Sequence, residues 1–257
     1  MRLVLQPAFV LHRRPYRNTS LLLDVLTPEQ GRIGLVARGV RTARSRLQGL
    51  LQPFQPLLLS GSGNGDLLGL TAAEEAGVPI PLPSTRWLSG LYVNELLLRL
   101  VQRHDPHPGL FAAYQTVLET LAGTGAEQAA LRIFEKCLLA EIGYGLLLDT
   151  EAHTGAPIVP ESVYRYVLDQ GPCHATQSET GILISGKSLL ALRQETFPEP
   201  AVLQEAKRLT RAAIGVHLQG RPLKTRELLV KLYQRRVGDR VRHHCPEAPS
   251  FSKGWQG

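Results

Sequence analysis

Cysteine, methionine and tryptophan are scarce in this 257-residue chain, which contains 3, 1 and 2 of them respectively. The three cysteines, Cys137, Cys173 and Cys245, are odd in number and far apart, which excludes a disulfide framework. No CxxC pair is present, and His243-His244-Cys245 offers too few ligands for a tetrahedral zinc site. We therefore expect neither a structural disulfide nor a bound metal.

Long apolar runs are also missing. No window approaches the roughly 20 consecutive apolar residues that a membrane-spanning helix needs. The first residues read MRLVLQPAFVLHRRPY, with neither the apolar core nor the small-residue cleavage site of a secretory signal. Internal repeats and low-complexity tracts are absent as well. We expect a cytoplasmic protein of one to three globular domains.

Catalytic motifs are missing too, because the histidines are scattered and neither GxSxG nor HExxH occurs. Glu74-Glu75 follows the last expected strand of the N-terminal region and is interpreted as solvated surface. One pattern does match, since residues 181–188, GILISGKS, satisfy GxxxxGK[ST]. A phosphate loop must wrap around its ligand between a strand and a helix, whereas residues 182–184 resemble the strand itself. We favour a strand end followed by a helix start, so we expect no enzyme; the alternative is a nucleotide-hydrolysing enzyme that uses Lys187.

What the chain does have is positive charge. Lysine and arginine total 29 against 22 acidic residues, a formal net charge of +7. No acid occurs between Glu29 and Asp66, and residues 38–46, RGVRTARSR, carry four arginines. Such a surface attracts anions, and arginine suits bidentate phosphate contacts.

Residues 1–77 show the pattern of a small β-barrel. A Pro-Glu-Gln-Gly turn joins the second and third expected strands, and GSGNGD joins the last two. Five short strands with tight turns fit a Greek-key barrel of the OB-fold type. The expected strands are Ala8–Arg13, Ser20–Thr27, Gly31–Ala37, Pro53–Ser60 and Leu67–Ala73.

Beyond an expected linker at residues 78–84, apolar residues recur at helical spacing. We predict a helical domain over residues 85–237, with a small inserted β element at about 146–184 and later helices at about 187–195, 201–218 and 225–235. Residues 238–257 have few apolar anchors and are expected to form a mobile tail. The predicted fold class is α+β, with several domains.

The arginines of the barrel are the candidate site. A barrel with a basic groove binds single-stranded nucleic acid, because arginines contact phosphates while aromatic rings stack on bases. Arg13, Arg14 and Arg17 are expected in the first hairpin connection, and Tyr16 and Phe54 are the nearby aromatic residues, although Phe54 fits the core better than a stacking surface. The alternative is a merely solvated loop. The predicted DNA-binding residues are Arg13, Arg14, Arg32, Arg38, Arg41, Arg44 and Arg46.

Several segments together resemble the RecO family of bacterial DNA repair proteins. They are AFVLHRRPYRNTSLLLDVLTPEQGRIGLVARGVR, LQPFQPLLL, SGLYVNELLLRL, LRIFE, IGYGLLLD, AKRLTR and GRPLKTREL, in order from Ala8 to about Arg236. The resemblance implies an N-terminal OB-fold and a C-terminal helical domain with a zinc-ribbon-like insertion. Some members hold zinc there with four cysteines, but this chain has only Cys173 in that region, so it resembles the zinc-free branch and no cofactor is implied.

The resemblance also implies a function. A protein of this family would bind single- and double-stranded DNA, anneal complementary strands and act with RecF. With RecR it would help to load RecA onto DNA coated by single-stranded-DNA-binding protein. The helical domain would receive the C-terminal tail of that coating protein, with Arg132 at the family's basic position and Ile133, Leu138 and Leu139 as pocket neighbours. An adaptor with an incidental basic surface is the remaining alternative.

Overall fold

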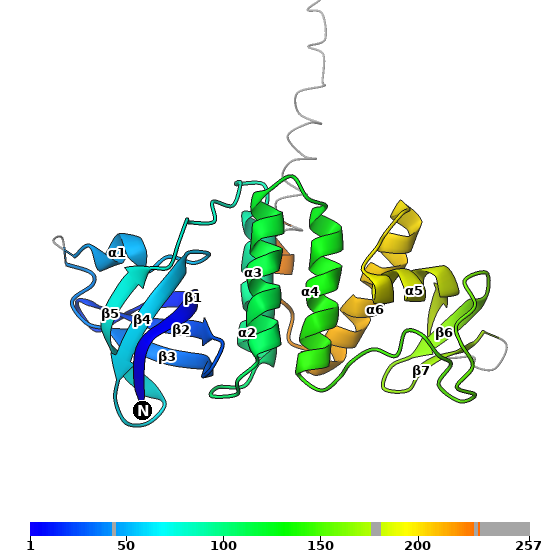
Figure 1. Ribbon diagram of the computed structural model, residues 1–257, viewed down its shortest axis with the longest axis horizontal. Coiled ribbons are helices and arrows are strands. Elements are labelled where there is room, and N and C mark those ends of the chain that lie inside the picture. Colours follow the sequence, from blue (N-terminus) through cyan, green and yellow to red (C-terminus); the bar gives the residue numbers. More distant parts are fainter. Residues whose placement is uncertain (43–44, 176–180, 229–230, 232–257) are drawn as a thin grey trace, which may run out of the picture. The chain divides into compact units, whose positions relative to one another are not determined.

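The computed structural model describes residues 1–42, 45–175, 181–228 and 231. The described residues fall into two compact units, which divide between Arg221 and Pro222. In the second unit, residues 224–228 are helical, which overlaps the start of the helix expected at 225–235. The expected tail at 238–257 lies outside the described residues. The first unit contains the barrel, the main helices and the inserted sheet (Figure 1).

The N-terminal region is a closed five-stranded barrel, which confirms the predicted OB-fold. The strand order around the barrel is β1-β2-β3-β5-β4, and β1 closes it by pairing with both β2 and β4. The β3–β5 pair is parallel, while the other pairs are antiparallel. The strands are β1 (Arg2–Tyr16), β2 (Ser20–Thr27), β3 (Gly31–Ala37), β4 (Pro56–Ser62) and β5 (Leu67–Glu75).

Strand β1 is longer than its apolar run predicted. It pairs with β4 through its first half and with β2 through its second, and its register shifts between Val10 and His12. Arg13 and Arg14 pair with β2 residues, so they lie inside the strand and not in the hairpin connection. Three further bounds differ, since β4 runs from Pro56 to Ser62 and β5 continues through Glu74 and Glu75, which are exposed.

Alternating residues of each strand fill the barrel. The inward side chains of β2 and β3 are among the most buried of the chain, because successive strand residues point to opposite faces. The central ones are Leu21, Leu23, Val25, Ile33 and Leu35. Between β3 and β4 the chain makes a single helical turn, α1 (Leu47–Leu50).

Helices and a second sheet complete this unit. The helices are α2 (Trp87–Leu100), α3 (Pro108–Ala122), α4 (Glu127–Glu141), α5 (Gly186–Gln194) and α6 (Pro200–His217). The inserted sheet has the order β7-β6-β8, with β6 (Val163–Val167), β7 (Gly171–His174) and β8 (Ile182–Ser185). Strand β7 was not predicted, because its sequence GPCH has no apolar alternation. No helix of the described residues is long and apolar enough to span a bilayer.

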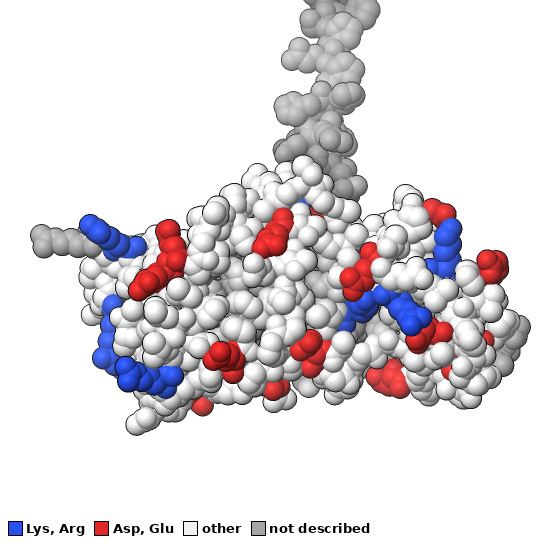
Figure 2. All heavy atoms as spheres, in the orientation of Figure 1, with Lys and Arg blue, Asp and Glu red and all other residues white. Residues whose placement is uncertain are grey.

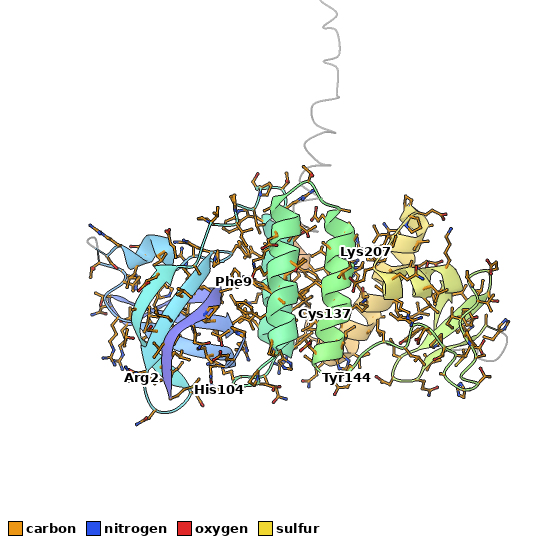
Figure 3. All side chains as sticks on the ribbon, viewed as in Figure 1. Arg2, Phe9, His104, Cys137, Tyr144 and Lys207 are labelled. Carbon is orange, nitrogen blue, oxygen red and sulfur yellow. The ribbon has the colours of Figure 1, made fainter. Side chains whose placement is uncertain are left out.

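The barrel packs directly against the helices. Residues 78–84 contain neither helix nor strand, yet Asn94 of α2 donates a hydrogen bond to the backbone oxygen of Leu11 at 2.9 Å. The Phe9 ring points from β1 toward the helices and lies 5.1 Å from the ring of Tyr114 (Figure 3). Phe54 is 3% exposed and packs edge-on against Trp87, so it belongs to the core and does not offer a stacking surface.

Tyr166 should make the stability of the inserted sheet sensitive to alkaline pH. Its hydroxyl accepts a hydrogen bond from the backbone N–H of Leu147 at 3.0 Å, and burial raises its pKa to about 12. Since an unfolded tyrosine ionises near pH 10, stability is full below pH 10 and declines toward pH 12, by about 3 kcal/mol for this group. Denaturant unfolding at pH 9, 10 and 11 should therefore show a shallower decline for Tyr166→Phe than for wild type. Equal declines would contradict this.

Candidate nucleic-acid interface

An open pocket of about 380 Å³ lies on the barrel where the β1–β2 turn, the end of β3 and the start of β5 meet. OB-folds bind oligonucleotides on the face of strands 2 and 3, between the loops that join strands 1–2 and strands 4–5. The pocket occupies this position. Its lining residues include Tyr16, Arg17, Val36, Arg38 and Leu67.

Two basic segments that are distant in sequence meet at this pocket. The backbone N–H of Arg41 donates a hydrogen bond to the Thr19 carbonyl at 2.8 Å, and its guanidinium donates to the Arg17 carbonyl at 3.3 Å. Gly39, with φ of +70°, lets the chain reverse after β3. The arginine-rich segment after β3 is therefore fastened to the β1–β2 turn.

Arg17 and Arg38 line the pocket, Arg41 is hydrogen-bonded to the Arg17 carbonyl, and Arg14 shares a face of β1 with the lining residue Tyr16. Arg14, Arg17, Arg38, Arg41 and Arg46 are exposed, and none forms a salt bridge with an acid of the described residues. The Arg17 guanidinium lies 5.3 Å from the Tyr16 ring centroid, within cation–π range. Figure 2 shows lysine and arginine atoms along the outer edge of the barrel. Arg44 was also predicted here, but it lies outside the described residues.

Two predicted arginines instead have partners within the protein. Arg13 is half-buried and donates to the backbone oxygens of Gln48 and Leu51 at 3.3 and 3.4 Å, so it holds α1 against the barrel. Arg32 lies 3.7 Å from Asp24, and burial, together with the nearby charge of Arg103, lowers its pKa. Both side chains have a structural role that their place in the sequence did not reveal.

The GxxxxGK[ST] segment does not form a phosphate loop. Strand β8 runs directly into α5, and the Ser185 side chain caps the helix by accepting from the Ser188 N–H at 3.2 Å. A carboxylate oxygen of Glu205 accepts from both the backbone and the hydroxyl of Ser185, at 2.9 and 2.7 Å. A Cβ on Gly186 would lie 2.0 Å from the Val159 carbonyl oxygen, so protein backbone fills the space beside it. The favoured interpretation, a strand end followed by a helix, agrees with this geometry.

The candidate peptide-binding residues of α4 are largely buried. Arg132 is 2% exposed, and Glu135 is wholly buried. Glu135 accepts hydrogen bonds from Arg132, from the Tyr92 hydroxyl of α2 and from the Thr210 hydroxyl of α6, each at 2.5 Å. Burial, and secondarily the Glu135 charge, raises the pKa of Tyr92 well above its usual value.

Arg132 keeps two unsatisfied donors, since its Nε and Nη1 are buried with no hydrogen-bond partner among the described residues. Leu138 and Leu139 are also wholly buried, so these two predicted pocket neighbours pack in the helical core and line no surface. Ile133 is half-buried. Burial, the Arg211 charge and then the Arg132 charge lower the pKa of neighbouring Lys207.

Several important residues were not among the predicted site residues. Arg17 was placed near the first hairpin but not counted among the ligand-binding residues, and Asp24 and Arg103 were not considered. Glu135 was considered only as an acid that is not paired for acid–base catalysis. The glycines at positions 31 and 34 of β3 were the available signal for Arg103, because they mark a close approach of another segment. For Glu135 the only signal was an acid on a strongly apolar helix face.

A closed OB-type barrel with exposed arginines, packed on a helical domain, is an arrangement typical of nucleic-acid-binding proteins. The chain matches two sequence families, described as "Recombination protein O N terminal" over residues 1–77 and "Recombination protein O C terminal" over residues 84–227. The chain therefore belongs to the RecO family, which makes it a protein of DNA repair and recombination.

Curated relatives agree with this assignment. A protein of Nitrosococcus oceani is 49% identical over 241 residues, which are 93% of this chain and 97% of the relative. Proteins of Methylococcus capsulatus and Coxiella burnetii are 48% and 47% identical over 227 and 228 residues, covering 88% and 89% of this chain and 93% and 98% of the relatives. All three are named DNA repair protein RecO.

Proposed function

We propose that this chain is a recombination mediator and not an enzyme. It binds single- and double-stranded DNA, anneals complementary strands and acts in the RecF pathway. With RecR it helps to load RecA onto DNA that is coated by single-stranded-DNA-binding protein. The observation that carries the proposal is the group of exposed arginines at the barrel pocket, Arg17 and Arg38 in its lining and Arg41 bonded to Arg17, which form no salt bridge with an acid of the described residues.

Phosphate neutralisation is the physical basis of annealing. Two complementary strands repel each other, and cations that contact phosphates release counterions and reduce this cost. Arginine contacts to phosphates carry no sequence information, so they serve any pair of complementary strands. An open pocket, unlike a closed cavity, leaves the bases of a bound strand free to pair.

Coated DNA requires a second contact, which we place on the helical domain. An acidic peptide that ends in a bulky apolar residue suits an arginine beside an apolar surface. Arg132 with its two unsatisfied donors, half-buried Ile133 and neighbouring Lys207 support this location. Because Arg132 is 2% exposed, the peptide reaches it only after a covering side chain moves.

Annealing of two complementary oligonucleotides tests the proposal. The barrel variant replaces Arg14, Arg17, Arg38 and Arg41 by alanine, and its annealing rate on naked strands should fall at least about tenfold, because phosphate contacts are lost. The control variant removes the same charge from exposed positions elsewhere, at Lys187, Arg193, Arg208 and Arg221. Equal losses in both variants would show that the basic barrel surface is incidental, as in an adaptor.

Strands coated with single-stranded-DNA-binding protein form the second arm of this experiment. Ile133→Glu places a negative charge where the acidic tail is proposed to bind. This variant should anneal naked strands at the wild-type rate and coated strands more slowly. If Ile133→Glu and wild type anneal coated strands at the same rate, the proposed peptide site is wrong. The proposal for the barrel surface would still stand.

A further inference from the structure

The loop between α2 and α3 lies tightly against the outer face of β3. The backbone N–H of His104 donates to the Arg32 carbonyl at 3.0 Å, and His104 lies beside the barrel in Figure 3. A Cβ on Gly31 would lie 1.9 Å from the Asp105 carbonyl oxygen, and one on Gly34 would lie 2.5 Å from Nη1 of Arg103. These two glycines are what allow the loop to approach the strand.

This loop places a second arginine beside Arg32. Nη2 of Arg103 lies 2.5 Å from Oδ1 of Asp24, and Arg32 lies 3.7 Å from the same oxygen. The Asp24 carboxylate therefore forms salt bridges with two guanidinium groups. The Arg103 side chain remains 34% exposed, against 16% for Asp24 and for Arg32, and Nε of Arg32 has no hydrogen-bond partner among the described residues.

The Arg103 guanidinium lies close to Leu67, one of the residues that line the barrel pocket. Arg32, Gly34 and Val36 alternate along β3 and so share its outer face. Gly34 pairs with Leu67 of β5, and both Leu67 and Val36 line the pocket. A Cβ on Gly34 would lie 2.6 Å from Cδ2 of Leu67 and 2.5 Å from Nη1 of Arg103, so these two side chains meet over Gly34. The basic surface thus continues from the pocket to a residue outside the barrel.

We propose that Arg103 extends the phosphate-binding surface along β3, and that Asp24 is a competing anion that weakens it. The ligand is the phosphate backbone of a single strand. When a phosphate binds Arg103, it takes the place of the Asp24 carboxylate, a partly exposed partner that holds the guanidinium only modestly. The proposal rests on the proposed function of the barrel pocket.

The salt dependence of binding to a thymidine homopolymer tests the contribution of Arg103. Arg103→Gln should reduce the slope of log K against log salt by about 0.7, the value of one single-strand phosphate contact. Between 50 and 200 mM salt, the ratio of the wild-type to the variant binding constant should then fall about 2.6-fold. If Arg103 only clamps the loop to the barrel, the melting temperature falls while the slope stays unchanged, which would overturn the proposal.

Asp24→Asn tests whether Asp24 competes with phosphate for Arg103. It also tests the role of Arg103 if the Arg103→Gln variant fails to fold. The loss of this carboxylate should raise affinity about two- to fivefold, since it frees Arg103 for phosphate. Glu75→Gln is the matched control, because it removes the same charge from an exposed residue at the far end of β5, about 26 Å along the strand from Leu67. Equal effects of the two substitutions, or none, would overturn the proposal.

Failure of this proposal can be told apart from failure of the pocket itself. The variant that lacks Arg14, Arg17, Arg38 and Arg41 is measured on the same homopolymer. If it binds as wild type does, the proposed function is wrong. If it binds weakly while the Arg103 and Asp24 variants behave as wild type, only the extension along β3 is wrong.

Discussion

Glu135→Gln is expected to lower the free energy of unfolding by about 3–5 kcal/mol, because it leaves the buried Arg132 without a compensating charge. Glu135 is wholly buried and accepts hydrogen bonds from side chains of α2, α4 and α6. A glutamine keeps the volume but has one acceptor oxygen in place of two. Its amide nitrogen cannot accept the hydrogen bond that the Thr210 hydroxyl donates to Oε2 of Glu135.

Urea unfolding followed by circular dichroism measures this change. Glu199→Gln is a suitable control, since Glu199 is an exposed acid paired with Lys187, and its substitution should change stability by no more than about 0.5 kcal/mol. A loss for Glu135→Gln as small as that of the control would show that the buried pair does not hold the three helices together.

The double variant Arg132→Met with Glu135→Gln separates charge from packing. Once both charges are gone, no uncompensated ion remains in the core, so the double variant should be more stable than Glu135→Gln alone. The loss in the double variant is compared with the losses in Arg132→Met alone and in Glu135→Gln alone. If the two single losses add up to the double loss, the coupling between Arg132 and Glu135 is absent. The result also bears on the proposed peptide site, because it measures how firmly Glu135 retains Arg132.

The largest expected effect on DNA binding comes from removing the four arginines around the barrel pocket, Arg14, Arg17, Arg38 and Arg41. If each contacts one phosphate of a single strand, the slope of log K against log salt falls by about 2.8. The ratio of the wild-type to the variant binding constant should then fall about 50-fold between 50 and 200 mM salt. The loss should be the same for oligonucleotides of different sequence, because phosphates are the contacted groups.

Fluorescence anisotropy of a labelled oligonucleotide at several salt concentrations gives these slopes. The control variant at Lys187, Arg193, Arg208 and Arg221 carries the same net charge, so it separates local contacts from the general attraction of a basic protein. Parallel lines for wild type and the barrel variant would contradict a phosphate surface at the pocket. A loss that depends on sequence would instead indicate contacts to bases.

The sequence alone determined much of the fold. Strands β2 and β3 have the predicted bounds, Ser20–Thr27 and Gly31–Ala37, because short apolar runs and a Pro-Glu-Gln-Gly turn between them are local signals. The helical spacing after residue 84 likewise predicted the helices. The same local reasoning rejected the phosphate loop at Lys187, since residues 182–184 have the pattern of a buried strand.

Only the tertiary structure decided what each charged side chain does. Arg13 and Arg38 look alike in the sequence, yet the first holds backbone carbonyls of α1 and the second is exposed at the pocket. Arg132 is on an amphipathic helix, but its burial follows from the approach of α2 and α6. A charged side chain often finds its partner on a segment that is distant in sequence, as Arg103 does in its salt bridge with Asp24. Residue type and local spacing determine strands and helices, whereas burial and pairing depend on which surfaces meet.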